Sequence, residues 1–182
     1  MSAKESKIKQ LIREYLLDEG LLRKQINDSK LDFGFQFVFP PIKDPTGRPL
    51  GRKMLVLRPK NKDFVVTSLV IQISPPHIDA LNSLEENRKL QFFMDLRKFF
   101  LMKNLFYRLD LQNYRYQISD QIFLKEDTTI SKNSFYKSIR HVFDGAAYSN
   151  LILGEYCMGK IKPEDFMKSK DFTPDSDFSL YS

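Results

Sequence analysis

The residues of this chain that could do chemistry are few and far apart. His77 and His141 are the two histidines, and the H-E-x-x-H and C-x-x-C patterns are absent. A protein metal site normally needs three or four converging ligands, so neither histidine predicts one. His77 follows Pro76 at an expected helix start, and His141 lies off the apolar face of the last helix. We therefore expect capping or surface roles for both.

Cys157 is the single cysteine, so an intramolecular disulfide framework is excluded. A nucleophilic cysteine needs a nearby base and a positive environment, and the flanking residues provide neither. We expect an inert thiol that is partly exposed, because its neighbour Tyr156 lies on the apolar face of the helix.

No nucleotide-binding loop is present either, since the glycine-rich G-x-x-x-x-G-K-[ST] and G-x-G-x-x-G patterns are missing. Glu85 and Glu86 are adjacent, so on a helix their side chains diverge by about 100° and cannot act as a carboxylate pair. We predict no catalytic, cofactor-binding or metal-binding residue and a protein that is not an enzyme. The alternative, an unrecognised hydrolase or transferase, would need a closed pocket of converging polar groups.

Positive charge gathers in one stretch of the chain. The net charge is +6 and the isoelectric point is near 9.3. Between positions 41 and 63 the sequence holds seven basic residues: Lys43, Arg48, Arg52, Lys53, Arg58, Lys60 and Lys62. This pattern predicts a nucleic-acid or anion-binding segment, with ordinary solvation of a surface loop as the alternative.

The periodicity of apolar residues predicts the elements that position these groups. Residues 4–19 have the three- and four-residue spacing of an amphipathic helix, and Gly20 suits its end. Residues 21–26 fit an edge strand. In residues 32–39 four phenylalanines alternate with other residues, which favours a strand whose rings belong to the core rather than to a base-stacking platform. Residues 53–58 and 64–73 read as two further strands.

The second half alternates helix, hairpin and helix. Residues 76–103 carry a buried stripe that the polar stretch 85–89 interrupts, so one helix and a kinked pair are both open, and Ser83 could cap a second helix. Residues 105–111 and 114–124 predict a hairpin. The last helix, about 131–158, has a seam that predicts dimerisation or helix packing: Val142, Gly145, Ala146, Ser149 and Leu153.

The order helix, three or four strands, helix, two strands, helix is similar to the type III secretion chaperone-like fold. The segments LIREYLLDEG, KLDFGFQFVFPP and ISPPHIDALNSLEENRKLQFFMDLRKFF, with LFYRLDL after them, resemble an archaeal family of uncharacterised domains with that fold. The resemblance covers about residues 8–156. It implies a single α+β domain with an antiparallel sheet packed against helices, and a dimer that binds extended client segments.

These observations together predict a single domain at residues 1–159, followed by a loosely docked or flexible tail at 160–182. No apolar run reaches the length of about 18 to 20 residues that a membrane span needs, and the first ten residues lack a signal-peptide core. We therefore predict a cytoplasmic, non-enzymatic protein-binding or chaperone-like module, homodimeric and without a cofactor. A nucleic-acid-associated protein that uses residues 43–62 is the alternative.

Overall fold

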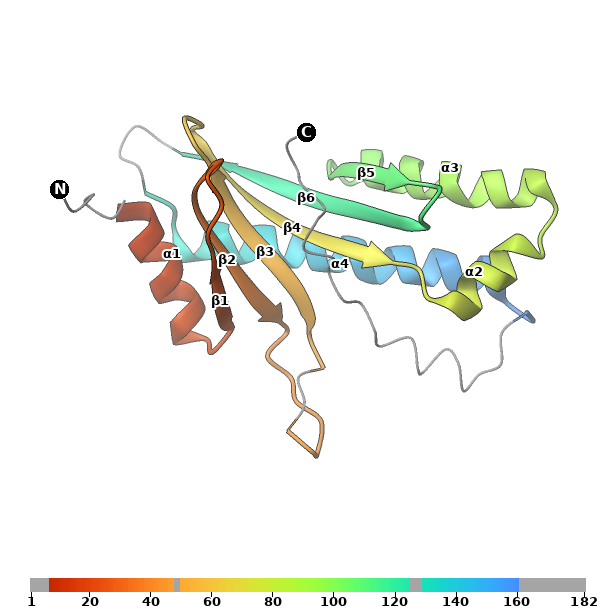
Figure 1. The fold of residues 1–182 in the computed structure, drawn as a ribbon, viewed down its shortest axis with the longest axis horizontal. Coiled ribbons are helices and arrows are strands. Elements are labelled where there is room, and N and C mark those ends of the chain that lie inside the picture. Colours follow the sequence, from red (N-terminus) through yellow and green to blue (C-terminus); the bar gives the residue numbers. More distant parts are fainter. Residues whose placement is uncertain (1–6, 48–49, 125–128, 161–182) are drawn as a thin grey trace. The chain divides into compact units, whose positions relative to one another are not determined.

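Four helices and six strands follow one another in the computed structural model, which describes residues 7–47, 50–124 and 129–160. The elements are α1 (Lys7–Asp18), β1 (Leu22–Ile26), β2 (Leu31–Phe39), β3 (Arg52–Pro59), β4 (Phe64–Gln72), α2 (Pro75–Asn82), α3 (Glu86–Met102), β5 (Phe106–Asp110), β6 (Arg115–Phe123) and α4 (Lys132–Cys157). The strands form an antiparallel sheet in the order β1-β2-β3-β4-β6-β5 (Figure 1).

The chain divides into two compact units, Met1–Ser68 with Ser119–Phe143, and Leu69–Ile118 with Asp144–Ser182. We call them the first and second units. Strands β4 and β6 and helix α4 each begin in one unit and continue into the other. That residues 1–159 form one domain therefore stays a prediction. The expected tail, apart from Lys160, lies outside the described residues.

The core of the first unit is built on the phenylalanine strand. Phe33, Phe35 and Phe37 of β2 are buried, as the period-two pattern predicts. Gly34, on the opposite side of the strand, is covered as well, because a Cβ there would lie 2.9 Å from a Leu57 methyl group. Three of the four phenylalanines of the pattern therefore belong to the core, and the fourth, Phe39, is half-buried.

The second unit has its own core, to which two helices and the sheet contribute. Phe92, Leu96 and Phe100 of α3 are buried, as are Tyr116 of β6 and Leu153 of α4. The Phe100 ring lies 5.8 Å from the Tyr116 ring. The hairpin from β5 to β6, which the sequence predicts, is closed by Asp110, whose carboxylate accepts hydrogen bonds from the backbone and side chain of Asn113.

The structure settles whether residues 76–103 form one helix or two. Helix α2 ends at Asn82 and α3 begins at Glu86. The N–H of Ser83 donates to the carbonyls of Asp79 and Ala80, and its hydroxyl donates to Ala80 at 2.7 Å. Ser83 therefore closes α2, and the prediction that it caps α3 is wrong. Glu85, with extended backbone, occupies that N-terminal position.

Candidate functional site

His77 and Cys157 are both buried in the second unit, which corrects two expectations from the sequence. His77 is 4% exposed and Cys157 is fully buried. The His77 Nδ1 shares a 2.7 Å hydrogen bond with the Ser74 hydroxyl, and the Cys157 thiol donates to the His77 carbonyl at 3.9 Å. His77 is thus not a surface residue, although it does bond Ser74, the N-terminal cap residue of α2. Cys157 is not partly exposed, because α4 turns it inward.

Burial also sets the protonation of these two side chains. It lowers the pKa of His77 below its usual 6.5 and raises the pKa of the Cys157 thiol to about 11. At neutral pH the imidazole is therefore uncharged and the thiol keeps its proton. The pair has the properties of core polar groups, and a thiol in this state is a poor nucleophile.

His141 is the histidine that lies at the surface, as the sequence predicts. Its Nδ1 is 3.7 Å from a carboxylate oxygen of Asp120, and its side chain is 36% exposed. This pair is a partly exposed contact between a helix and a strand of the first unit. Within residues 7–47, 50–124 and 129–160, no group of three or more His, Cys, Asp or Glu side chains is placed to hold a metal ion.

Strand β3 separates the basic residues of the predicted segment into two groups. Arg52 lies at the start of β3, and the seven residue steps to Pro59 span about 24 Å at ~3.4 Å per residue. Lys43, Arg52 and Lys53 lie towards the start of the strand, and Arg58, Lys60 and Lys62 towards its end. Arg48 lies outside the described residues.

The individual basic side chains are also in different states. Lys43, Lys53, Lys60 and Lys62 are exposed, and Arg52 is half-buried. Arg58 pairs with the Asp32 carboxylate at 3.1 Å, and its Nε donates to the Lys62 carbonyl at 3.4 Å. Part of the charge of Arg58 is therefore already compensated by Asp32. The six of these residues that the structure describes therefore lie in two groups, at the two ends of β3.

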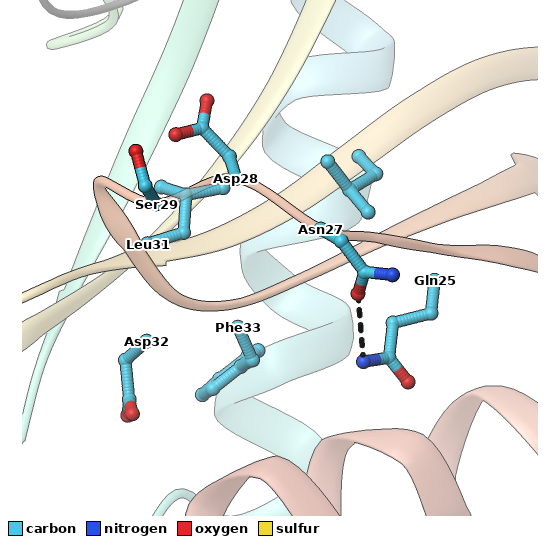
Figure 2. A pocket seen from close by; sticks show the side chains of 8 residues that line it. Gln25, Asn27, Asp28, Ser29, Leu31, Asp32 and Phe33 are labelled. Atoms are coloured by element: carbon cyan, nitrogen blue, oxygen red, sulfur yellow. Dashed lines mark hydrogen bonds between the residues drawn. The ribbon is translucent and has the colours of Figure 1, made fainter.

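A shallow polar hollow of about 320 Å³ lies near Asp32, at the turn between β1 and β2 (Figure 2). Asp28 accepts from the Lys30 N–H at 2.8 Å, and the Gln25 side chain donates to Asn27 at 3.2 Å. These polar groups stabilise the turn itself. The hollow therefore has the character of a turn surface rather than of a reaction site.

The predicted seam of α4 is buried within a single chain. Its five members are all buried: Val142, Gly145, Ala146, Ser149 and Leu153. The Ser149 hydroxyl accepts from Tyr116 at 2.7 Å, and a Cβ on Gly145 would lie 2.5 Å from a methyl group of Leu105. The burial of these residues within one chain favours the helix-packing interpretation over a dimer seam, and the choice between the two stays a prediction.

The second unit carries an exposed apolar surface that the sequence analysis missed. Seven large side chains on the outer sides of α3 and α4 and just beyond α4 are 41% to 77% exposed: Leu90, Met94, Leu101, Met102, Tyr148, Leu151 and Met158. We call this set the α3–α4 surface. The signal was present in the sequence, because α3 is apolar on more than one side and only one side can face the core.

The two helices of this surface lie side by side. The ring of Phe99 on α3 stacks on Tyr148 of α4 at 4.4 Å, and Phe92 contacts Tyr156 at 5.5 Å. The Tyr156 hydroxyl donates to the Asp95 carboxylate at 2.6 Å. These three contacts hold α3 against α4. At about 100° per residue, the exposed Leu90, Met94 and Leu101 lie on the side of α3 that faces away from these contacts.

Charges of both signs lie beside the apolar residues of the α3–α4 surface. Arg97, Lys98 and Lys103 are exposed at the end of α3, and Lys98 pairs with the Asp95 carboxylate at 3.4 Å. The hydrogen bond from Tyr156 lowers the pKa of the Asp95 carboxyl. Glu86 on α3 and Asp144 and Glu155 on α4 are exposed as well.

The chain belongs to a family of uncharacterised conserved proteins, DUF2299, whose model matches residues 8–153. The matched range agrees with the extent of the resemblance described from the sequence. No protein with a curated description is similar to this chain.

Two solved structures are similar to it. An uncharacterised protein from Methanothermobacter thermautotrophicus is 22% identical with a TM-score of 0.70, over 81% of this chain and 97% of that chain. ExsC, crystallised in the ExsC-ExsE complex, is 13% identical with a TM-score of 0.51, over 82% and 96%. The predicted α+β fold of type III secretion chaperone-like form is thereby confirmed. Of the described helices, not one combines the length and apolar character that crossing a membrane requires.

Proposed function

We propose that this protein is a non-enzymatic, chaperone-like module that binds a client segment on the α3–α4 surface. The observation that carries the proposal is the set of large exposed apolar side chains in the second unit, four on α3, two on α4 and Met158 just beyond α4. Exposed apolar surface of this kind commonly marks a protein interaction site. The remaining exposed large apolar side chains lie on other elements: Leu17, Ile42, Leu50 and Phe123 in the first unit, and Phe106 and Leu111 in the second.

The likeness to ExsC supports a protein partner. ExsC was crystallised in a complex with ExsE, and it shares the fold of this chain. A shared fold does not imply a shared function, so the likeness to ExsC is an analogy. The proposal rests on the exposed apolar side chains. The surface lies on helices rather than on loops, which gives a client a rigid face to bind.

The energetic scale of such binding follows from the residues. Leu101 and Leu151 are each 63% exposed, so covering them fully would contribute about 1 to 2 kcal/mol each, roughly two thirds of the value for a fully exposed leucine. Each ~1.4 kcal/mol changes an affinity tenfold. Replacing both leucines with serine should therefore weaken client binding by at least tenfold.

The test uses fluorescently labelled, reduced and carboxymethylated α-lactalbumin as an unfolded probe, titrated with the full chain. We expect binding by the native protein and binding at least tenfold weaker for the Leu101→Ser, Leu151→Ser double variant. Leu17→Ser is the matched control, because Leu17 is 48% exposed on a helix of the first unit. Equal affinities of all three proteins would overturn the proposal, as would a lack of binding by all three.

The proposal includes a homodimer, which the resemblance to the chaperone-like fold implies, and a cytoplasmic location, which the lack of long apolar runs in the sequence favours. Light scattering coupled to size exclusion, at low and high salt, measures the mass directly. A dimer has twice the 21.5 kDa of one chain. A mass of one chain at all concentrations would remove dimerisation from the proposal and leave client binding untouched.

A further inference from the structure

We propose that the loop between β2 and β3, described at residues 40–47 and 50–51, attaches the first unit to a membrane surface that carries anionic lipids. In this arrangement Ile42 and Leu50 enter the interfacial region of the bilayer, and Lys43 and Lys53 contact the negatively charged headgroups. The inference goes beyond the proposed client binding and does not depend on it, because these residues and the α3–α4 surface have no member in common.

The first observation is an exposed apolar pair. Ile42 is 53% exposed and Leu50 is 45% exposed. The Leu50 N–H donates to the Ile42 carbonyl at 2.8 Å, which places the two residues opposite each other across the loop. Residues directly opposite each other in an antiparallel pair carry their side chains on the same side. The pair therefore presents one small aliphatic surface to solvent.

Hydrogen bonds hold the described part of the loop in shape. The Asp44 carboxylate accepts from the Thr46 N–H at 2.9 Å and from the Thr46 hydroxyl at 2.6 Å. The N–H of Gly47, whose φ of +83° suits glycine, donates to the Asp44 carbonyl at 2.9 Å. At the base of the loop, a Cβ on Gly51 would overlap the Pro40 carbonyl oxygen, so the two arms approach closely. A loop held in this way loses less conformational entropy on binding than a flexible one.

Two lysines lie beside the apolar pair. Lys43 adjoins Ile42 in the sequence, and Lys53 is the second residue of β3. Both are exposed, and neither has an ion-pair partner among the described residues. Arg52, half-buried at the start of β3, adds a third positive charge. Asp44, the acid of the loop, is occupied by the hydrogen bonds within the turn.

The acids of α1 do not cancel the charge of these lysines. The base of the loop lies near the end of α1, because the Val38 N–H donates to the Leu21 carbonyl at 3.1 Å. The two acids at that end, Asp18 and Glu19, pair with Lys132 at 3.4 and 3.0 Å. They are engaged with a cation of their own, so the two loop lysines are available to lipid headgroups.

The form of the loop favours a bilayer over other partners. Figure 1 shows that the loop extends beyond the ends of β1 and β2. Two protruding aliphatic side chains offer far less than the roughly 800 Å² per partner of a stable protein interface. Residues 40–51 contain no aromatic ring on which a base could stack. A bilayer needs neither, since aliphatic groups enter its interface and its anionic headgroups attract cations.

The first test measures the binding of the full chain to large unilamellar vesicles by sedimentation. Vesicles of phosphatidylcholine with about 30% phosphatidylserine carry negative surface charge, and pure phosphatidylcholine vesicles lack it. We expect the native chain to bind the anionic vesicles at least tenfold more tightly than the neutral ones. Ile42→Ser with Leu50→Ser, and separately Lys43→Glu with Lys53→Glu, should each weaken this binding at least tenfold, because each removes one of the two contributions.

Phe123→Ser is the matched control. Phe123 is 70% exposed in the part of β6 that belongs to the first unit. Its ring lies 5.8 Å from that of Phe64 at the start of β4, and β4 runs antiparallel to β3, so Phe123 lies away from the loop. This variant should bind vesicles like the native chain. Equal binding by all four proteins, or no binding of the native chain to anionic vesicles, would overturn the inference.

The second test reports whether the apolar pair enters the bilayer. Leu50→Cys is labelled with the environment-sensitive fluorophore NBD, and the native Cys157 stays unlabelled because it is buried. We expect the emission to shift to the blue and to gain intensity when anionic vesicles are added. Phe123→Cys, labelled in the same way, should show no change. An unchanged emission from the label at position 50 on bound vesicles would contradict insertion and overturn the inference.

Competition separates lipid from other anions. Inorganic phosphate at constant ionic strength should leave vesicle binding unchanged, and displacement of the vesicles by phosphate would identify a free-anion site instead. Duplex DNA should bind more weakly than the anionic vesicles. If DNA binds more tightly, with Lys43→Glu and Lys53→Glu abolishing its binding and Ile42→Ser and Leu50→Ser leaving it intact, the loop contacts nucleic acid and the inference is wrong.

Discussion

The hydroxyl of Tyr156 on α4 donates a 2.6 Å hydrogen bond to the carboxylate of Asp95 on α3. This bond lowers the pKa of the Asp95 carboxyl, and burial together with the carboxylate raises the pKa of Tyr156 to about 12. The two pKa shifts are consistent with each other, because both favour a protonated tyrosine hydroxyl beside an ionised carboxylate. The pair joins the two helices that present the apolar surface.

Removing this hydrogen bond should loosen α3 from α4. We expect Tyr156→Phe to lower the free energy of unfolding by about 1 kcal/mol, since the carboxylate is partly exposed and water can replace the lost donor. The ring contact with Phe92 is kept in this variant. Urea denaturation measures the change. Tyr148→Phe is the control and should stay within about 0.5 kcal/mol of the native chain. Equal stabilities of Tyr156→Phe and the native protein would contradict the expectation.

The buried Cys157 thiol should resist modification. With its pKa raised to about 11, it is protonated at pH 8 and shielded from solvent. We expect Ellman's reagent to react with the folded chain at least a hundredfold more slowly than with the chain in 6 M guanidinium chloride. The experiment needs no variant, because the chain has a single cysteine. Comparable rates in the two conditions would show that the thiol is accessible.

His77 predicts an acid-sensitive fold near neutral pH. Its pKa is lowered by burial below 6.5, so the unfolded chain binds the proton more tightly than the folded one. The stabilisation is complete above about pH 6.5 and is lost as the pH falls towards the folded pKa. The slope is at most about 1.36 kcal/mol per pH unit for one group. We expect urea midpoints measured between pH 7.5 and 5 to fall for the native chain and to fall less for His77→Gln. Parallel curves would contradict this assignment.

Gly145 tests the packing of the α4 seam. A Cβ at this position would lie 2.5 Å from a methyl group of Leu105, which is itself buried. We expect Gly145→Ala to cost about 1 to 3 kcal/mol, and the added Leu105→Ala change to cost less in that background than alone, because it makes room. Chemical denaturation of the four proteins gives the coupling. If Gly145→Ala changes the oligomer mass and leaves stability intact, the residue belongs to an interface between chains.

The alternative function as a nucleic-acid-associated protein makes its own prediction. Because β3 separates the basic residues into two groups of about three, each group could contact about three phosphates. The logarithm of the binding constant for duplex DNA would then fall with the logarithm of salt with a slope near −3. Filter binding with the native chain and with Lys60→Glu, Lys62→Glu measures this slope. Binding that ignores salt, or the absence of binding, removes the alternative.

Local patterns were sufficient for most of the elements. The alternation of Phe33, Phe35 and Phe37 identified a core strand, because strand geometry places every second side chain on one face. The helical spacing of apolar residues likewise predicts the bounds of α4 closely. The polar stretch between α2 and α3 is compatible with one helix or with two. The hydrogen bonds of Ser83 show that there are two.

The site was less accessible to such reasoning. Spacing indicated which side of α4 is apolar, and it placed Val142 and Ala146 on one seam. It could not say whether that seam meets the same chain or another. Local spacing also could not predict that Cys157 and His77 are buried. Burial depends on how separate elements pack, and the neighbours of a residue in the sequence do not indicate that packing.

The element order, the phenylalanine core, the charge and the lack of known catalytic motifs can be read from residue type and local spacing. The packing of separate elements, in contrast, places the basic residues at the two ends of β3, buries the α4 seam, and leaves apolar side chains of α3 and α4 exposed. A helix with apolar residues on two sides can bury either one. The contacts of Phe99 with Tyr148 and of Tyr156 with Asp95 determine which side remains for a partner.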